Sequence, residues 1–178
     1  MARFTGVMPE SRIRGVDILI LVCVGASEYG FDRLLKYVDE LCESGVIEGQ
    51  DVVAQVGCAK YKPKYYRFFD LIGRTEFQNY MEKADVIITH AGTGSVIPPL
   101  KIEKKVIVFP RRAQYGEHVD DHQMELAEVF TSAGYTLCAE NKEELQKALI
   151  EVQNFTPKVF KSNKGNIDRI LIDFIEST

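Results

Sequence analysis

The segment "DVIITHAGTGS" (residues 85–95) decides the fold of this chain. Residues 85–90 contain the run Val-Ile-Ile, which is typical of a strand buried on both faces of a parallel sheet. Two glycines then alternate with two hydroxyl side chains, a composition typical of a turn that opens a helix. A buried strand that passes through a glycine-rich turn into a helix indicates an α/β domain.

Short apolar runs and amphipathic runs alternate through the rest of the chain. Further strands are predicted over residues 16–25, 51–57, 65–72, 105–110 and 135–139. Apolar residues at helical spacing predict helices over 31–45, 74–84 (capped by Thr75), 118–134, 142–152 and 166–176, with a short helix after residue 95. This alternation predicts a parallel, Rossmann-like sheet in a three-layer α/β/α sandwich. We expect one α/β domain over residues 16–178, ending in the helix at 166–176, after an N-terminal extension at residues 1–15.

The composition argues against several classes of protein. The 178 residues carry a formal net charge of -4, so no global positive field indicates a nucleic-acid partner. The four cysteines form no C-x-x-C pair, which favours a reducing cytosol over a disulfide framework. Residues 1–15 lack the apolar centre of a signal peptide, and the longest apolar run, residues 18–26, is far shorter than the ~20 residues of a membrane span. We expect a cytoplasmic chain that reaches a membrane only peripherally, through a partner.

One segment departs from the acidic character of the chain. "KYKPKYYRF" (residues 60–68) contains three Lys, one Arg and three Tyr. Such a segment is most often a solvated loop, but the same composition also suits phosphates or lipid headgroups. The sequence leaves both interpretations open.

The loops that follow the strands are the places to look for a ligand. In open parallel sheets, ligands bind outside the carboxyl ends of the strands, near the point where the strand order reverses. The rule selects residues 25–30, 58–64, 90–95 and 110–118. In the first of these loops, Gly25, Ala26 and Ser27 lead to a helix whose first amides can face a phosphate. A tight turn between strand and helix explains the same residues, so this loop alone does not distinguish a phosphate site from a simple turn.

The loop "HAGTGS" (residues 90–95) predicts an anion-binding site. Gly92 and Gly94 let the backbone approach a ligand, and Thr93 and Ser95 add hydroxyl donors at the start of a helix. No Lys follows, so the loop is not a nucleoside-triphosphate P-loop. Helix capping is the alternative, but two such loops at neighbouring strand ends favour binding.

A third polar cluster is "EHVDDHQ" (residues 117–123). On the predicted helix, His118 and His122 are four residues apart and share a face. A zinc site is one interpretation, but Glu does not follow the first His as in H-E-x-x-H, so no metal site is expected. Asp121, His122 and Gln123 at a helix start suit the hydroxyls of a sugar. Simple N-terminal capping by the acidic residues is the alternative.

"HAGTGS", "KVIVFPR" and "EHVDDHQMELAEVF" together resemble the C-terminal, donor-binding half of the family 28 glycosyltransferases, which have the GT-B fold. The resemblance covers residues 16–150. "VGASEYGFDRLL" supports it, because "FDRL" is similar to the branch of the family that divides the enzyme over two chains. In that branch, a small chain binds the nucleotide sugar, and a membrane-anchored chain binds the lipid-linked acceptor.

The resemblance implies a donor site. Gly25, Ala26 and Ser27 are expected to meet the diphosphate, and residues 70–75 to hold the uracil edge through their backbone. The residues expected at the ribose and phosphates are His90, Gly92, Thr93, Gly94 and Ser95, and those expected at the sugar are Asp121, His122 and Gln123. Family members carry an acidic residue for the ribose hydroxyls where Pro98 stands here, so ribose recognition is expected to differ.

The implied reaction is inverting transfer from UDP-GlcNAc or UDP-galactose to a lipid-linked saccharide. A membrane-anchored subunit would bind the acceptor, since a GT-B enzyme needs two such domains and this length fits one. Backbone amides can stabilise the departing UDP, so neither a cofactor nor a metal is expected. The acceptor hydroxyl needs a general base, for which His90 and His118 are candidates because histidine titrates near neutral pH, with the partner as the other source.

Two other functions stay open beside transfer. A non-catalytic nucleotide-sugar-binding or regulatory module would keep the same loops. A small hydrolase or epimerase is less compatible, because related epimerases carry both halves in one chain. The helix at 166–176 either packs on the sheet, which is the simpler expectation, or docks the partner.

Overall fold

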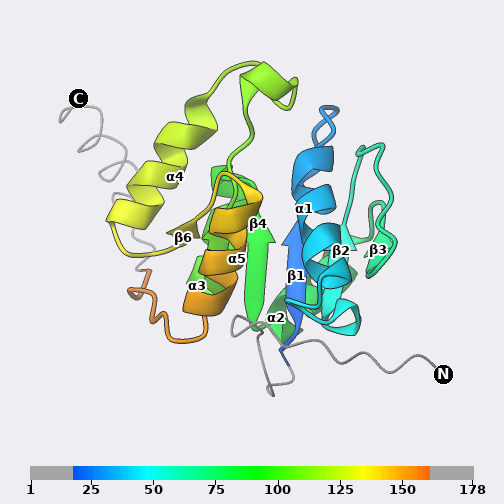
Figure 1. The fold of residues 1–178 in the computed structure, drawn as a ribbon. Coiled ribbons are helices and arrows are strands. Elements are labelled where there is room, and N and C mark those ends of the chain that lie inside the picture. Colours follow the sequence, from blue (N-terminus) through cyan, green and yellow to red (C-terminus); the bar gives the residue numbers. More distant parts are fainter. Residues whose placement is uncertain (1–17, 161–178) are drawn as a thin grey trace.

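The computed structural model describes residues 18–160. The predicted N-terminal extension at residues 1–15 and the predicted helix at 166–176 lie outside the described residues. Within them, strands and helices alternate around one sheet (Figure 1). No helix in this range has the length and apolar composition that crossing a bilayer requires.

The sheet has the order β3-β2-β1-β4-β5-β6, and every neighbouring pair is parallel. The strands are β1 (Ile20–Cys23), β2 (Val52–Gln55), β3 (Arg67–Phe69), β4 (Val86–Thr89), β5 (Lys105–Val108) and β6 (Leu137–Cys138). This is the doubly wound order, in which the strand order reverses between β1 and β4. The predicted parallel sheet is confirmed, with each strand shorter than its apolar run.

Helices cover both faces of the sheet and make three layers (Figure 1). One face carries α1 (Asp32–Glu43) and α5 (Lys142–Glu151), and the other carries α2 (Arg74–Lys83), α3 (Thr93–Lys101) and α4 (His122–Ser132). Two single 3-10 turns, η1 (Gly49–Asp51) and η2 (Ala113–Tyr115), lie in the connections.

Burial on both faces explains the continuous apolar runs. In β1, Ile20 and Val22 belong to the core beneath α1 and α5, whereas Leu21 between them packs with Met81 of α2. Because successive side chains point to opposite faces, a strand covered on both sides is apolar at most positions, and here the buried polar exceptions Gln55 and Thr89 stand at the ends of β2 and β4. The same requirement makes the runs in the sequence good predictors of the sheet.

One predicted helix start and one predicted helix cap are wrong. The helix predicted over 118–134 begins at His122, with Asp121 at its N-cap, so His118 and His122 do not share a helical face. The carboxylates before it are used in turns: Asp120 accepts the His122 amide at 3.2 Å, and Asp121 accepts the Ala113 amide at 2.9 Å. In α2 the N-cap is Gly73, not Thr75.

Candidate functional site

The loops after β1 and β4 meet at the point where the strand order reverses. Gly25 has a left-handed φ of 79°, and a Cβ there would lie 2.7 Å from Nε2 of His90. A Cβ on Gly92 would lie 2.5 Å from Cε1 of the same ring. The imidazole of His90 therefore fills the space between two glycines, and a side chain at either position would displace it.

Both nitrogens of His90 have hydrogen-bond partners. The Gly92 amide donates to Nδ1 at 3.1 Å, and Nε2 lies 2.9 Å from Oγ of Ser95. A proton on Nε2 satisfies both contacts. Burial lowers the pKa of His90 to about 4, and the positive charge of Arg111 adds to this shift. The ring is therefore neutral at pH 7 and joins the end of β4 to the first turn of α3.

The N-terminus of α3 is not capped by any side chain. The amides of Ser95 and Val96 bond the Gly92 carbonyl at 2.9 and 3.0 Å, whereas those of Thr93 and Gly94 have no acceptor within residues 18–160. Unpaired amides at a helix start carry partial positive charge and can bind an anion.

Arg111, which sequence reasoning missed, holds the loop after β1. It is 1% exposed, and its guanidinium donates to the carbonyls of Val24 at 2.6 Å, Tyr29 at 2.8 Å and Glu117 at 2.8 Å. The guanidinium carbon lies 4.9 Å from the Phe31 ring centroid. Ala26 and Ser27 lie exposed between the two fixed ends of this loop. A charged residue directly after a buried strand is the sequence signal for Arg111.

A second missed feature is the ion pair between Arg33 of α1 and Glu117. Two parallel contacts of 2.9 and 2.8 Å join the groups, and their side chains are 12% and 5% exposed. Arg33 also lies over the rings of Phe109 and Tyr115, at 4.7 and 4.8 Å from their centroids. The pair fixes the loop after β5 to α1. Its sequence signal is Arg33 within "FDRL".

The residues predicted around the third loop separate into two groups. Gln123 is 6% exposed, accepts the Arg111 amide at 3.2 Å and lies close enough to His90 to oppose the lowering of its pKa. His118 lies close enough that its positive charge also lowers the pKa of His90. By contrast, His122 is exposed and faces Glu125 of its own helix at 3.0 Å. Asp121 is engaged by the loop after β5.

The structure thus brings Gly25, His90, Gly92, Ser95 and Gln123 together. Residues 70–75 lie at the end of β3, which is the edge strand and two strands away from β1. Pro98 is an exposed residue inside α3. Among residues 18–160, no group of three or more His, Cys, Asp or Glu is placed to hold a metal ion.

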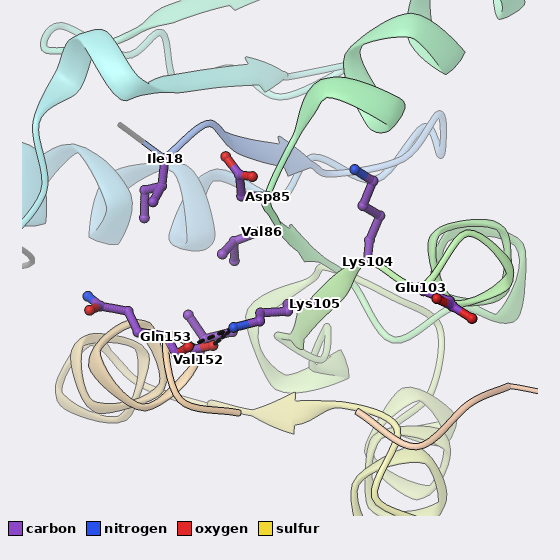
Figure 2. A pocket seen from close by; sticks show the side chains of 8 residues that line it. All are labelled: Ile18, Asp85, Val86, Glu103, Lys104, Lys105, Val152 and Gln153. Atoms are coloured by element: carbon purple, nitrogen blue, oxygen red, sulfur yellow. Dashed lines mark hydrogen bonds between the residues drawn. The ribbon is translucent and has the colours of Figure 1, made fainter. Parts of the chain in front are cut away.

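Two pockets lie at opposite ends of the parallel strands. One, of about 480 Å³, lies beside the start of α1 and is lined by Gly30, Lys36 and Tyr115 among others. The other, of about 400 Å³, lies at the amino ends of β4 and β5 (Figure 2). There Lys105 donates to the carbonyls of Val152 and Gln153 at 2.9 and 2.7 Å. Its ammonium group is therefore bonded to the C-terminal end of α5. The second pocket is remote from the glycine loops.

Sequence comparison finds similar proteins that carry names. UDP-N-acetylglucosamine transferase subunit ALG13 of Saccharomyces cerevisiae is 29% identical over 175 residues, covering 87% of this chain and 85% of the relative. The protein of the same name from Cryptococcus neoformans is 29% identical over 102 residues. That match covers 55% of this chain and only 49% of the relative, so this chain matches about half its length.

Solved structures share the fold. The solution structure of ALG13 has a TM-score of 0.59 at 20% identity and covers 89% of this chain and 97% of that one. The calicheamicin glycosyltransferase CalG4 has a TM-score of 0.57 at 13% identity, with 93% and 40% covered. The model of the glycosyltransferase family 28 C-terminal domain matches residues 19–176. The chain therefore belongs to the glycosyltransferase family 28 C-terminal domain family.

Proposed function

We propose that this chain is the donor-binding, catalytic subunit of an inverting, UDP-sugar-dependent glycosyltransferase. Its acceptor is a lipid-linked saccharide, bound by a membrane-anchored partner subunit. The observation that carries the proposal is the meeting of two glycine loops and an uncapped helix N-terminus at the point where the strand order reverses. A UDP diphosphate is the anion that this family membership favours for such a site.

The residue roles follow from position. The loop Gly25–Ala26–Ser27 and the free amides of Thr93 and Gly94 would bind the diphosphate, where negative charge grows as UDP leaves. Gly92 and Ser95 would keep His90 in place behind this cradle. Gln123, held next to His90, is the residue of the Asp121–Gln123 group best placed to face the sugar. In this arrangement backbone amides stabilise the leaving group, so the proposal includes no metal or cofactor.

Between the two histidines, His118 is better suited to be the general base. Its Nδ1 faces Oδ1 of Asp120 at 2.9 Å, which orients the ring and leaves Nε2 available. His90 has both nitrogens engaged and a pKa of about 4, so it is proposed to organise the cradle. A general base supplied by the partner subunit is the alternative to His118.

UDP-GlcNAc is the preferred donor, with UDP-galactose as the second, because relatives of this chain are named UDP-N-acetylglucosamine transferase subunits. The word "subunit" in those names also supports a partner. We place the complex at the cytoplasmic face of a membrane, with this chain attached peripherally.

Two measurements test the proposal. Saturation-transfer NMR of the chain with UDP, UDP-GlcNAc and UDP-galactose should show binding through the UDP moiety, and absence of UDP binding would refute the proposal. Transfer of radiolabelled sugar to a lipid-linked acceptor is then measured with and without the partner. UDP-sugar binding without transfer under either condition would identify a non-catalytic nucleotide-sugar-binding module instead.

A further inference from the structure

The basic segment at residues 60–68 forms an ordered platform beside the site. Exposed and inward-facing residues alternate along its first half: Lys60, Lys62 and Lys64 are exposed, whereas Tyr61 is half-buried and Pro63 is buried. The side chains of all three lysines are therefore exposed to solvent, and we call Lys60, Lys62 and Lys64 the lysine platform.

Two aspartates of α1 fix the backbone of this segment. Asp39 is 2% exposed and accepts the amides of Lys64 and Tyr65, and the Tyr61 hydroxyl at 2.6 Å. Asp32 accepts the amides of Lys60 and Tyr61 at 2.9 and 3.1 Å. These carboxylates bond main-chain and tyrosine donors, not the ammonium groups, so the lysine charges are left to face outward on a fixed backbone.

Acidic residues lie around the platform, but Asp32, Asp39 and Glu43 bond backbone amides and tyrosine hydroxyls rather than its ammonium groups, and exposed apolar groups border it. Lys62 pairs with Asp70, while the side chains of Lys60 and Lys64 have no ion-pair partner within residues 18–160. The Lys62 ammonium lies 5.6 Å from the Phe68 ring centroid, and Phe68 is 39% exposed. Tyr65 and Leu71 are also exposed. Lysines beside exposed aromatic and aliphatic groups suit the boundary between lipid headgroups and acyl chains.

The platform begins at the same end of the sheet as the glycine loops. It belongs to the connection from β2 to β3, and Figure 1 shows that this connection, the loop after β1 and the start of α4 share one end of the sheet. A surface that met the lysines would also lie next to the candidate site.

We infer that the lysine platform docks this chain on an anionic lipid bilayer. The chain as a whole carries a net charge of -4, which opposes binding to an extended polyanion such as nucleic acid. Binding to a bilayer requires attraction only between the lysines and the anionic headgroups next to them. The inference does not rest on the proposed function, because docking requires neither donor nor acceptor.

Vesicle sedimentation tests the inference with the full chain. The probes are vesicles of phosphatidylcholine alone and vesicles in which part of it is replaced by phosphatidylserine. The wild type should bind only the second kind, and added salt should release it. Failure to bind phosphatidylserine vesicles, or equal binding to both kinds, would overturn the inference.

A matched pair of triple variants locates the surface. K60Q/K62Q/K64Q should bind phosphatidylserine vesicles on the order of a hundredfold more weakly, from the typical contribution of each basic residue. K83Q/K101Q/K147Q removes the same charge at exposed positions elsewhere and should bind as the wild type does. Equal loss in both variants would contradict the assignment, as would displacement from vesicles by a single-stranded oligonucleotide at equal phosphate concentration. Thermal unfolding confirms that both variants are folded.

Discussion

Oγ of Ser95 and Nε2 of His90 lie 2.9 Å apart, so the residue that follows β4 is bonded to the first turn of α3. The same ring lies against the positions where Gly25 and Gly92 lack side chains. One imidazole thus sets the distance between the loops after β1 and β4. Its protonation state and the two glycines should therefore control the shape of the proposed diphosphate cradle.

The lowered pKa of His90 predicts a loss of stability in acid. Because the folded pKa of about 4 lies below the ordinary value of 6.5, the unfolded chain takes up the proton first as the pH falls. The contribution of neutral His90 is complete above pH 6.5 and is lost as the pH falls towards 4, on the order of 3 kcal/mol. Urea unfolding at pH 7 and pH 4.5 measures this loss. In His90→Gln the free energy of unfolding should depend clearly less on pH. If it depends on pH as much as in the wild type, His90 is not the source of the effect.

Substitution of Gly25 should disrupt the contact with His90. Gly25→Ala adds a Cβ in a left-handed conformation and against the imidazole, whereas Gly45→Ala, at φ 72°, meets nothing within 4 Å. Both variants should lose about 1 kcal/mol from the backbone conformation, and Gly25→Ala about 1–3 kcal/mol more from the clash. Denaturant unfolding and UDP titration compare them. Only Gly25→Ala should also weaken UDP binding. Equal free energies of unfolding for the two variants would mean that His90 moves away from the added Cβ without energetic cost.

The strands and the glycine loops could be predicted from the sequence because each depends on local pattern. A strand buried on both faces is mostly apolar, as are all of β1 and the first three residues of β4. The position of His90 beside the glycine turn is likewise local. These features required no knowledge of distant partners.

The groups that hold the loops in place could not be predicted in the same way. Arg33 and Glu117 are 84 residues apart, and Arg111 bonds carbonyls at Val24 and Tyr29, 87 and 82 residues away. A local pattern can mark Arg33 or Arg111, but it does not identify the distant group that each one contacts. The start of α4 was misplaced for a related reason, since Asp121 bonds the amide of Ala113 across a turn and serves as the N-cap.

The ion pair between Arg33 and Glu117 should contribute strongly to stability. Glu117→Ala leaves a nearly buried guanidinium without its carboxylate, and loss of one member of such a pair costs about 3–5 kcal/mol. The exposed pair of Lys142 and Glu40, at 2.8 Å, is the matched control, and Glu40→Ala should change stability little. Unfolding in urea ranks the two variants. Similar small losses in both would show that the buried pair does not fix the loop after β5.

Arg111 should support diphosphate binding through its charge as well as through the loop. Its buried guanidinium bonds only carbonyl oxygens, while the carboxylate that acts on its charge, on Glu117, is bonded to Arg33. Arg111→Met removes three bonds to carbonyls and should destabilise the chain by about 3 kcal/mol. If the charge acts on the diphosphate, UDP affinity should fall at least about tenfold while uridine affinity changes much less, since a cation stabilises a nearby anion in a low-dielectric site. Arg111→Lys should restore part of the UDP affinity. Titrations of both ligands with all three proteins decide the matter: equal losses for UDP and uridine would reduce Arg111 to a purely structural role.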